Sequence, residues 1–165
     1  MAKTKKVRRP LTVIGWREWV ALPGLSVPYI RVKVDTGAQT SALHAFNLER
    51  FEHEDGREWV SFEVHPLQHK RRPSVAVEAP MHDLRRVRSS NGRSELRPVI
   101  LTDLGLPDQS WPIELTLTRR DEMTFRMLLG REALRGHCLV DTGKSYLLAA
   151  PAGAPETTKK PTKKG

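Results

Sequence analysis

Asp35, Thr36 and Gly37 are the residues of this sequence whose types and spacing are best suited to chemistry. Residues 29–34 before them alternate polar and apolar side chains, which predicts a half-buried strand that ends at Asp35. Gly37 permits a tight turn there, and its small neighbours let a second chain segment approach. Two such carboxylates held about 3 Å apart share one proton and activate water. The alternative is an ordinary turn without a chemical role.

Three segments along the chain carry a resemblance to a known family: residues 13–23, 35–45 and 127–134. Together they resemble the bacterial retropepsin-like proteins often labelled ATP-dependent zinc proteases, some of which are associated with the ribosomal-modification glutamate ligase. In retropepsins, an apolar-apolar-Gly-Arg segment and a short helix support the Asp-Thr-Gly loop. The resemblance therefore assigns catalysis to Asp35, Thr36 and Gly37, and support of the loop to Ala38, Leu128, Leu129, Gly130 and Arg131.

The function implied by this resemblance is that of an aspartic-type peptidase, either an endopeptidase or a carboxypeptidase-like hydrolase. Each chain of a weak homodimer contributes one Asp35, and Thr36 ties the two loops together across the axis. The implied substrates are acidic or glutamate-tailed peptides linked to ribosomal protein modification. Two other classes stay open, namely a non-catalytic barrel that binds ribosomes or RNA and a zinc-dependent hydrolase.

A predicted hairpin lies between the Asp-Thr-Gly motif and the Gly-Arg segment. Residues 89–92, Ser-Ser-Asn-Gly, are typical of a tight turn between two extended runs. The resemblance makes this hairpin the flap that closes over substrate, with the binding residues Arg88, Ser90, Asn91 and Gly92. The nearby arginines, among them Arg85, favour acidic peptides. The alternative is an exposed hairpin with a solvated charged face.

The remaining pattern indicates an all-β protein. Residues 111–117 and 123–129 both alternate and are predicted to pair antiparallel with each other. Residues 131–135 form a short helix that stops at Gly136. The other predicted strands are residues 11–20, 41–50, 58–64, 138–140 and 145–148. The predicted fold is a closed retropepsin-like (acid protease) barrel with one short C-terminal helix.

The formal net charge of +9 is concentrated at the two ends of the chain. Residues 1–10 form a predicted basic flexible arm, residues 11–150 the retropepsin-like domain, and residues 151–165 a disordered Lys-rich tail. Such tails either keep the protein solvated or attract ribosomes or RNA. No membrane-spanning run and no signal peptide are evident, so a cytoplasmic location without membrane contact is predicted.

Two further features weigh against other chemistries. The second Asp-Thr-Gly motif, at residues 141–143, is followed by too little chain for a second lobe, so we interpret it as a turn without a catalytic role. His65 and His69 have zinc-ligand spacing, but Pro66 between them disfavours the helix they need. Neither a metal site nor a cofactor is predicted. Cys138 has an apolar context and is predicted to be a buried, inert thiol.

Overall fold

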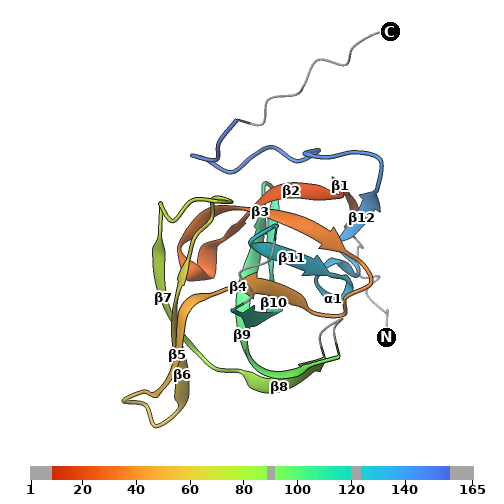
Figure 1. The fold of residues 1–165 in the computed structure, drawn as a ribbon. Helices are drawn as coiled ribbons and strands as arrows, with labels where there is room; N and C mark the ends of the chain where they lie inside the picture. The colour runs from red at the N-terminus through yellow and green to blue at the C-terminus, as the bar shows by residue number, and fades with distance from the viewer. Residues whose placement is uncertain (1–8, 89–91, 120–123, 157–165) are drawn as a thin grey trace, which may run out of the picture.

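The computed structural model describes residues 9–88, 92–119 and 124–156. Within these ranges the chain is mostly β, with one short helix (Figure 1). In chain order the elements are β1 (Thr12–Gly15), β2 (Arg17–Leu22), η1 (Pro23–Leu25), β3 (Val27–Asp35), β4 (Ser41–His44), β5 (Phe46–Glu52), β6 (Glu58–Val64), β7 (Val75–Pro80), β8 (Asp83–Arg88), β9 (Ser94–Leu106), β10 (Gln109–Thr118), β11 (Met127–Gly130), α1 (Arg131–Leu134) and β12 (Cys138–Asp141).

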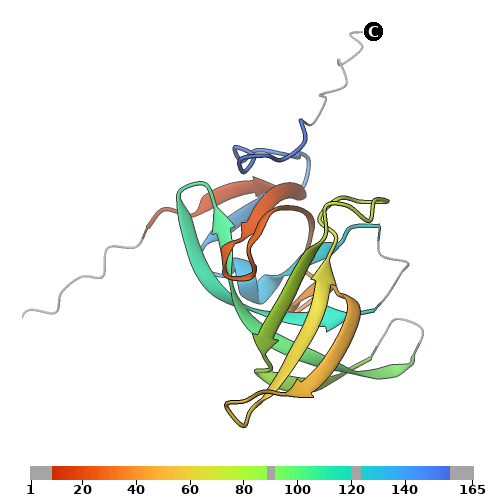
Figure 2. The ribbon, with the colours of Figure 1, turned by 90° about the vertical axis from the view of Figure 1, so that its left-hand side faces the viewer.

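The strands form three sheets around one apolar core. The largest has the order β10-β4-β11-β3-β2-β9-β8, β5-β6-β7 form a second, and β1 and β12 pair as a third. Figure 2 shows β5, β6 and β7 as a separate layer in front of the large sheet. Fully buried side chains such as Ile30, Leu43 and Leu115 fill the core, because alternate residues of each strand point inward.

A closed barrel is not confirmed. Strand β9 pairs with β10 along most of β10, but the register records only Ala21 with Gly105 between β9 and β2. The predicted all-β character with a single short helix is confirmed for the described residues. No helix among those residues is long and apolar enough to cross a membrane. Residues 1–8 and 157–165, which hold most of the two predicted tails, lie outside the description.

The predicted antiparallel pairing of residues 111–117 with residues 123–129 is wrong. Strand β10 pairs antiparallel with β9 and parallel with β4, whereas β11 pairs parallel with β3 and antiparallel with β4. Strand β4 therefore lies between the two. Alternation identifies the buried face of each strand correctly, but it does not identify the neighbour, because any strand with the same apolar face fits beside it.

Three predicted strands differ from the observed ones. The segment 11–20 breaks at Trp16 into β1 and β2, and the segment 41–50 breaks at Ala45 into β4 and β5, which belong to different sheets. Residues 145–148 are not a strand. At both breaks the chain passes from one sheet to another within a single alternating run. The alternation continues across the break, so it does not show where the change of sheet occurs.

Glu18 explains why residues 145–148 are held without strand pairing. Its side chain is only 1% exposed. One carboxylate oxygen accepts the N–H groups of Gly15 at 2.6 Å and Leu147 at 2.9 Å, and the other accepts the N–H of Leu148 at 3.1 Å. A buried carboxylate with three backbone donors thus joins β2 to the segment that follows β12, and it satisfies groups that would otherwise be unpaired.

We expect Glu18→Gln to lower the free energy of unfolding by about 3 kcal/mol, because the amide nitrogen then faces backbone donors inside the core. Urea denaturation measures the loss, with Glu78→Gln on the exposed side of β7 as the matched control. Equal stability of the two variants would show that the Glu18 bonds contribute nothing to the fold.

Candidate functional site

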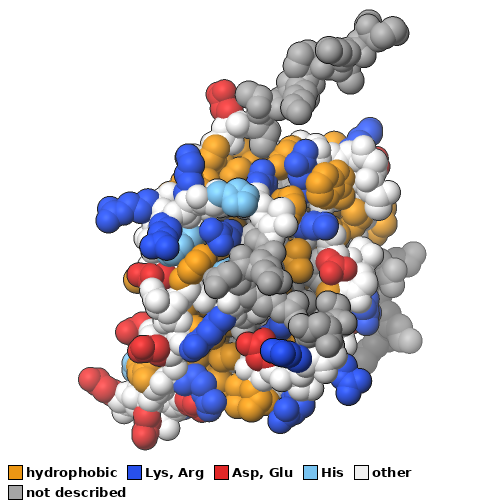
Figure 3. Space-filling view, viewed as in Figure 1, with side chains coloured by type: hydrophobic (Ala, Val, Ile, Leu, Met, Phe, Trp, Pro, Cys, Tyr) orange, Lys and Arg blue, Asp and Glu red, His pale blue; other side chains and the backbone are white. Residues whose placement is uncertain are grey.

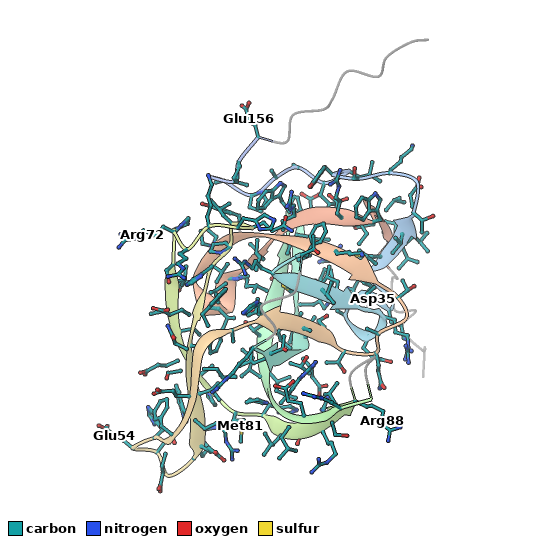
Figure 4. All side chains as sticks on the ribbon, in the orientation of Figure 1. Asp35, Glu54, Arg72, Met81, Arg88 and Glu156 are labelled. Atoms are coloured by element: carbon teal, nitrogen blue, oxygen red, sulfur yellow. The ribbon has the colours of Figure 1, made fainter. Side chains whose placement is uncertain are left out.

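The Asp35 loop is a closed turn at the end of β3, as predicted. The Gly37 N–H donates to Asp35 Oδ1 at 3.1 Å, and the Ala38 N–H donates to the Asp35 carbonyl at 3.1 Å. Asp35 is half-buried, while Thr36 and Gly37 are exposed. Figure 4 labels Asp35 at the end of β3, a central strand of the large sheet. The turn engages only Oδ1 of the carboxylate, so Oδ2 has no partner in its own loop.

The predicted support residues lie directly against this loop. Strand β11 runs parallel to β3 and places Gly130 beside Asp35. A Cβ on Gly130 would lie 2.7 Å from the carbonyl carbon of Thr40, so only glycine permits this approach. The Arg131 N–H donates to the Ala38 carbonyl at 2.9 Å, and its guanidinium donates to the Gly37 carbonyl at 3.2 Å. Leu129 is buried in the core and Leu128 is half-buried beside it.

Gln39, which follows Ala38 in the loop, has no carboxylate to offer the Arg131 guanidinium. That guanidinium instead donates to a backbone group, the Gly37 carbonyl. The Gln39 carbonyl in turn accepts the N–H of Glu132 at 3.1 Å. The first turn of α1 therefore secures the loop through three backbone carbonyls and needs no carboxylate.

The second Asp-Thr-Gly loop repeats this geometry. The Gly143 N–H donates to Asp141 Oδ1 at 3.0 Å, and the Lys144 N–H donates to the Asp141 carbonyl at 3.2 Å. Strand β1 places Gly15 beside Asp141 in a parallel pair, as β11 places Gly130 beside Asp35. This support does not come from the short chain after the motif, on which our interpretation of the motif was based. Val13-Ile14-Gly15, far upstream, supplies it.

Trp16 connects the two loops through the backbone. Its N–H donates to the Lys144 carbonyl at 2.8 Å, and its carbonyl accepts the N–H of Val34 at 2.8 Å. The strand end before Asp35 and the turn after Asp141 are therefore attached to the same residue. The catalytic assignment of Asp35 and the non-catalytic assignment of Asp141 both stay predictions.

The predicted hairpin is present as β8 and β9, which pair antiparallel out to Arg88 with Ser94. Ser90 and Asn91 lie outside the described residues, while Gly92 has a positive φ of 81°. Arg88 is exposed, and Figure 4 shows it on the same side of the view as Asp35. The assignment of this hairpin as a flap stays a prediction.

Arg85 at the base of the hairpin is engaged by acidic neighbours. Its guanidinium donates to both carboxylate oxygens of Glu114, at 2.6 and 2.9 Å, and to Asp83 at 2.7 Å. The hydrogen bonds from Arg85 hold the pKa of Glu114 below its usual value. A hollow of about 310 Å³ between the Asp35 loop, β10 and α1 is lined by Glu114 and Glu132. Arg85 is therefore already paired within the fold, and the attraction of acidic peptides by the hairpin arginines stays a prediction.

Among the described residues, no group of three or more His, Cys, Asp and Glu side chains is placed to hold a metal ion. His65 follows β6 and stacks on Phe46 with 3.8 Å between ring centres. Cys138 is partly buried at the start of β12, and burial, with a smaller contribution from Glu18, raises the pKa of its thiol to about 11.

Both the sequence and the fold of this chain have known relatives. The family model described as RimB-like, retropepsin-like aspartic endopeptidase RimB, matches residues 13–151. The chain belongs to the RimB-like family. In fold it is similar to a crystallised protein of unknown function from Legionella pneumophila, with a TM-score of 0.63 and 25% identity over 82% of this chain and 97% of that one.

Relatives at about 50% identity carry a name that differs from the description of the family. The chain is 52% identical over 136 residues to a probable alpha-L-glutamate ligase of Parasynechococcus marenigrum, covering 82% of this chain and 29% of the relative. It is 48% identical over 136 residues to the probable alpha-L-glutamate ligase of Shewanella pealeana, covering 82% of this chain and 30% of the relative. The chain thus spans about three tenths of the length of these relatives.

These names correct the predicted function. The prediction of an aspartic-type peptidase, and with it the classification as hydrolase and protease, is contradicted, because relatives at about half identity are named as ligases. The relatives' name is that of an enzyme, but it gives no support to the endopeptidase type. The name ATP-dependent zinc protease is not supported either. Membership of the retropepsin-like family is confirmed.

We expect Gly130→Ala to destabilise the protein by about 3 kcal/mol, because the new methyl group meets backbone atoms of the Asp35 loop. Gly37→Ala is the matched control, since its nearest neighbour is the movable carboxylate of Asp35 at 3.3 Å. Urea denaturation compares the two variants. A Gly130→Ala protein as stable as the control would contradict the close support described above.

The Cys138 thiol should react slowly in the folded protein. With its pKa at about 11, the thiolate fraction at pH 8 is about a hundredfold lower than that of an ordinary cysteine, and reactivity should rise as the pH approaches 11. Mass spectrometry follows iodoacetamide labelling in buffer and in urea. Similar labelling rates in the two conditions would show that Cys138 is not protected by the fold.

Proposed function

We propose that this chain is an acidic-peptide-binding domain that serves α-L-glutamate ligation. The observation that carries the proposal is the match of 82% of the chain to proteins named probable alpha-L-glutamate ligase. Each ligated glutamate adds a negative charge to its acceptor. A domain that works with such a reaction therefore needs to bind polypeptides that are rich in carboxylates.

The composition of this segment indicates which step of the reaction it serves and which step belongs to the rest of the longer relatives. Forming a peptide bond requires an activated carboxyl group, and the sequence shows no Gly-rich nucleotide-binding loop that would hold the activating nucleotide. In the relatives, about seven tenths of the chain lies outside the matching segment. We place activation and bond formation in that remaining part, and recognition of the glutamate-rich polypeptide in the segment described here.

The distribution of charge on the body supports recognition of carboxylates. Figure 3 shows Lys and Arg side chains gathered at the upper left, around histidine, whereas Asp and Glu gather at the lower left. The basic patch lies over the ends of β6 and β7, where Figure 4 labels Arg72. Cationic side chains held on one face attract an acidic chain and orient it.

The predicted weak homodimer, and the predicted contact of the basic tails with ribosomes or RNA, remain predictions. Residues 1–8 and 157–165 carry most of that tail charge and lie outside the described residues. An acidic segment of a ribosomal protein is compatible with the proposal, because it presents the same carboxylates as a free glutamate-rich peptide.

Fluorescence anisotropy of labelled hexaglutamate tests the proposal. The protein should bind hexaglutamate at least about tenfold more tightly than neutral hexaglutamine at low salt, and added salt should weaken the binding by screening. The control peptide has the same length and backbone, so the difference isolates the carboxylates. Equal binding of both peptides, or no binding of hexaglutamate, would overturn the proposal.

A further inference from the structure

A hollow of about 640 Å³ lies between the start of β5 and the loop that joins β6 to β7. We call it the β6–β7 pocket, and its defining residues are Phe46, Asn47, Glu63, His65, Arg71 and Arg72. Figure 4 shows Arg72 on the opposite side of the view from Asp35. The pocket is therefore separate from the Asp35 loop and from the hairpin β8–β9.

Stacked rings build one wall of the β6–β7 pocket. Phe46 lies between His44, at 4.1 Å between ring centres, and His65, at 3.8 Å, with both pairs close to parallel. His44 and His65 are only 2% and 7% exposed. The wall is therefore rigid. Because a histidine covers each face of the Phe46 ring, neither face is available for a nucleobase to stack on.

The electrostatics of the wall favour an anion. Burial lowers the pKa of His65, Glu63 opposes this effect, and the positive charges of Arg126 and Arg71 lower the pKa further. His65 Nδ1 is buried, and the described residues offer it no hydrogen-bond partner. Glu63 is engaged by Asn47, whose amide donates to it at 2.7 Å. The pocket lining holds two arginines, Arg71 and Arg72, against the one acid Glu63, so cationic groups outnumber acidic ones there.

Arg71 and Arg72 supply the binding groups. Both are exposed on the loop, and neither forms an ion pair with a described residue. Arg85 in the hairpin, by contrast, is already paired with Glu114 and Asp83. A guanidinium binds a carboxylate through two parallel hydrogen bonds, which makes two neighbouring arginines suited to consecutive acidic side chains.

We propose that the β6–β7 pocket binds side-chain carboxylates of a glutamate-rich peptide. Arg71 and Arg72 pair with the carboxylates, and the edge of Phe46 contacts the methylene groups of the glutamate side chain. This inference rests on the proposed function and names its binding site. A peptide is favoured over RNA because the covered faces of Phe46 exclude base stacking, whereas a carboxylate needs only the guanidinium groups.

The test uses the full chain and labelled hexaglutamate, with anisotropy as the readout. Arg71→Glu/Arg72→Glu reverses both pocket charges at exposed positions and should weaken binding at least about tenfold. The matched control is Arg9→Glu/Lys144→Glu, which makes the same change in net charge at two exposed positions outside the pocket. The control should change affinity by less than about threefold, and circular dichroism confirms that both variants are folded.

The possible outcomes distinguish a failure of the proposed binding site from a failure of the proposed function. Normal hexaglutamate binding by Arg71→Glu/Arg72→Glu overturns the assignment of the β6–β7 pocket as the binding site, but it leaves the proposal of acidic-peptide binding intact. Equal losses in the two double variants also overturn it, because they reveal a response to net charge alone. No binding by the unmodified chain overturns the proposed function itself. Tighter binding of labelled oligouridine than of hexaglutamate, lost in the pocket variant, assigns the site to RNA instead.

Discussion

The close approach of glycine to an Asp-Thr-Gly turn is the constraint on which this structure depends. Gly130 meets the backbone of Thr40, and Gly15 meets the backbone of Lys144, at distances that leave no space for a side chain. In each case a short strand runs parallel to the strand that ends in aspartate. Two loops far apart in sequence therefore have the same shape, because the same packing rule forms both.

Pairing within the fold decides which charges are available to a ligand. The hairpin β8–β9 is rich in arginine, yet Arg85 is paired with Glu114 and Asp83. The hollow beside the Asp35 loop includes Glu114 and Glu132 in its lining and no basic residue. Arg71 and Arg72 lie across the molecule on a loop with no ion pair among the described residues. Attraction of an acidic peptide is thus expected at the loop between β6 and β7 rather than at the hairpin.

Membership of a family and the function of a chain are separate conclusions here. The chain, with its Asp35 turn and its Gly130 support, belongs to the retropepsin-like RimB-like family. The names of the long relatives nevertheless belong to ligases. One fold can serve different chemistries, so the function has to be argued from the groups that a given surface presents.

The local features of this protein could be predicted from neighbouring residues. The Asp35 turn, the stop at Gly136, the helix at Arg131 and the buried faces of the strands all follow from short stretches of sequence, because turns and alternation are short-range. The strand partners, the support of Asp141 by Gly15, the burial of Glu18 and the assembly of the β6–β7 pocket became known only from the three-dimensional structure. These features depend on contacts between residues that are distant in sequence. Several strands have the same apolar pattern, so the pattern alone fits more than one arrangement, and the packing of the whole chain determines which one forms.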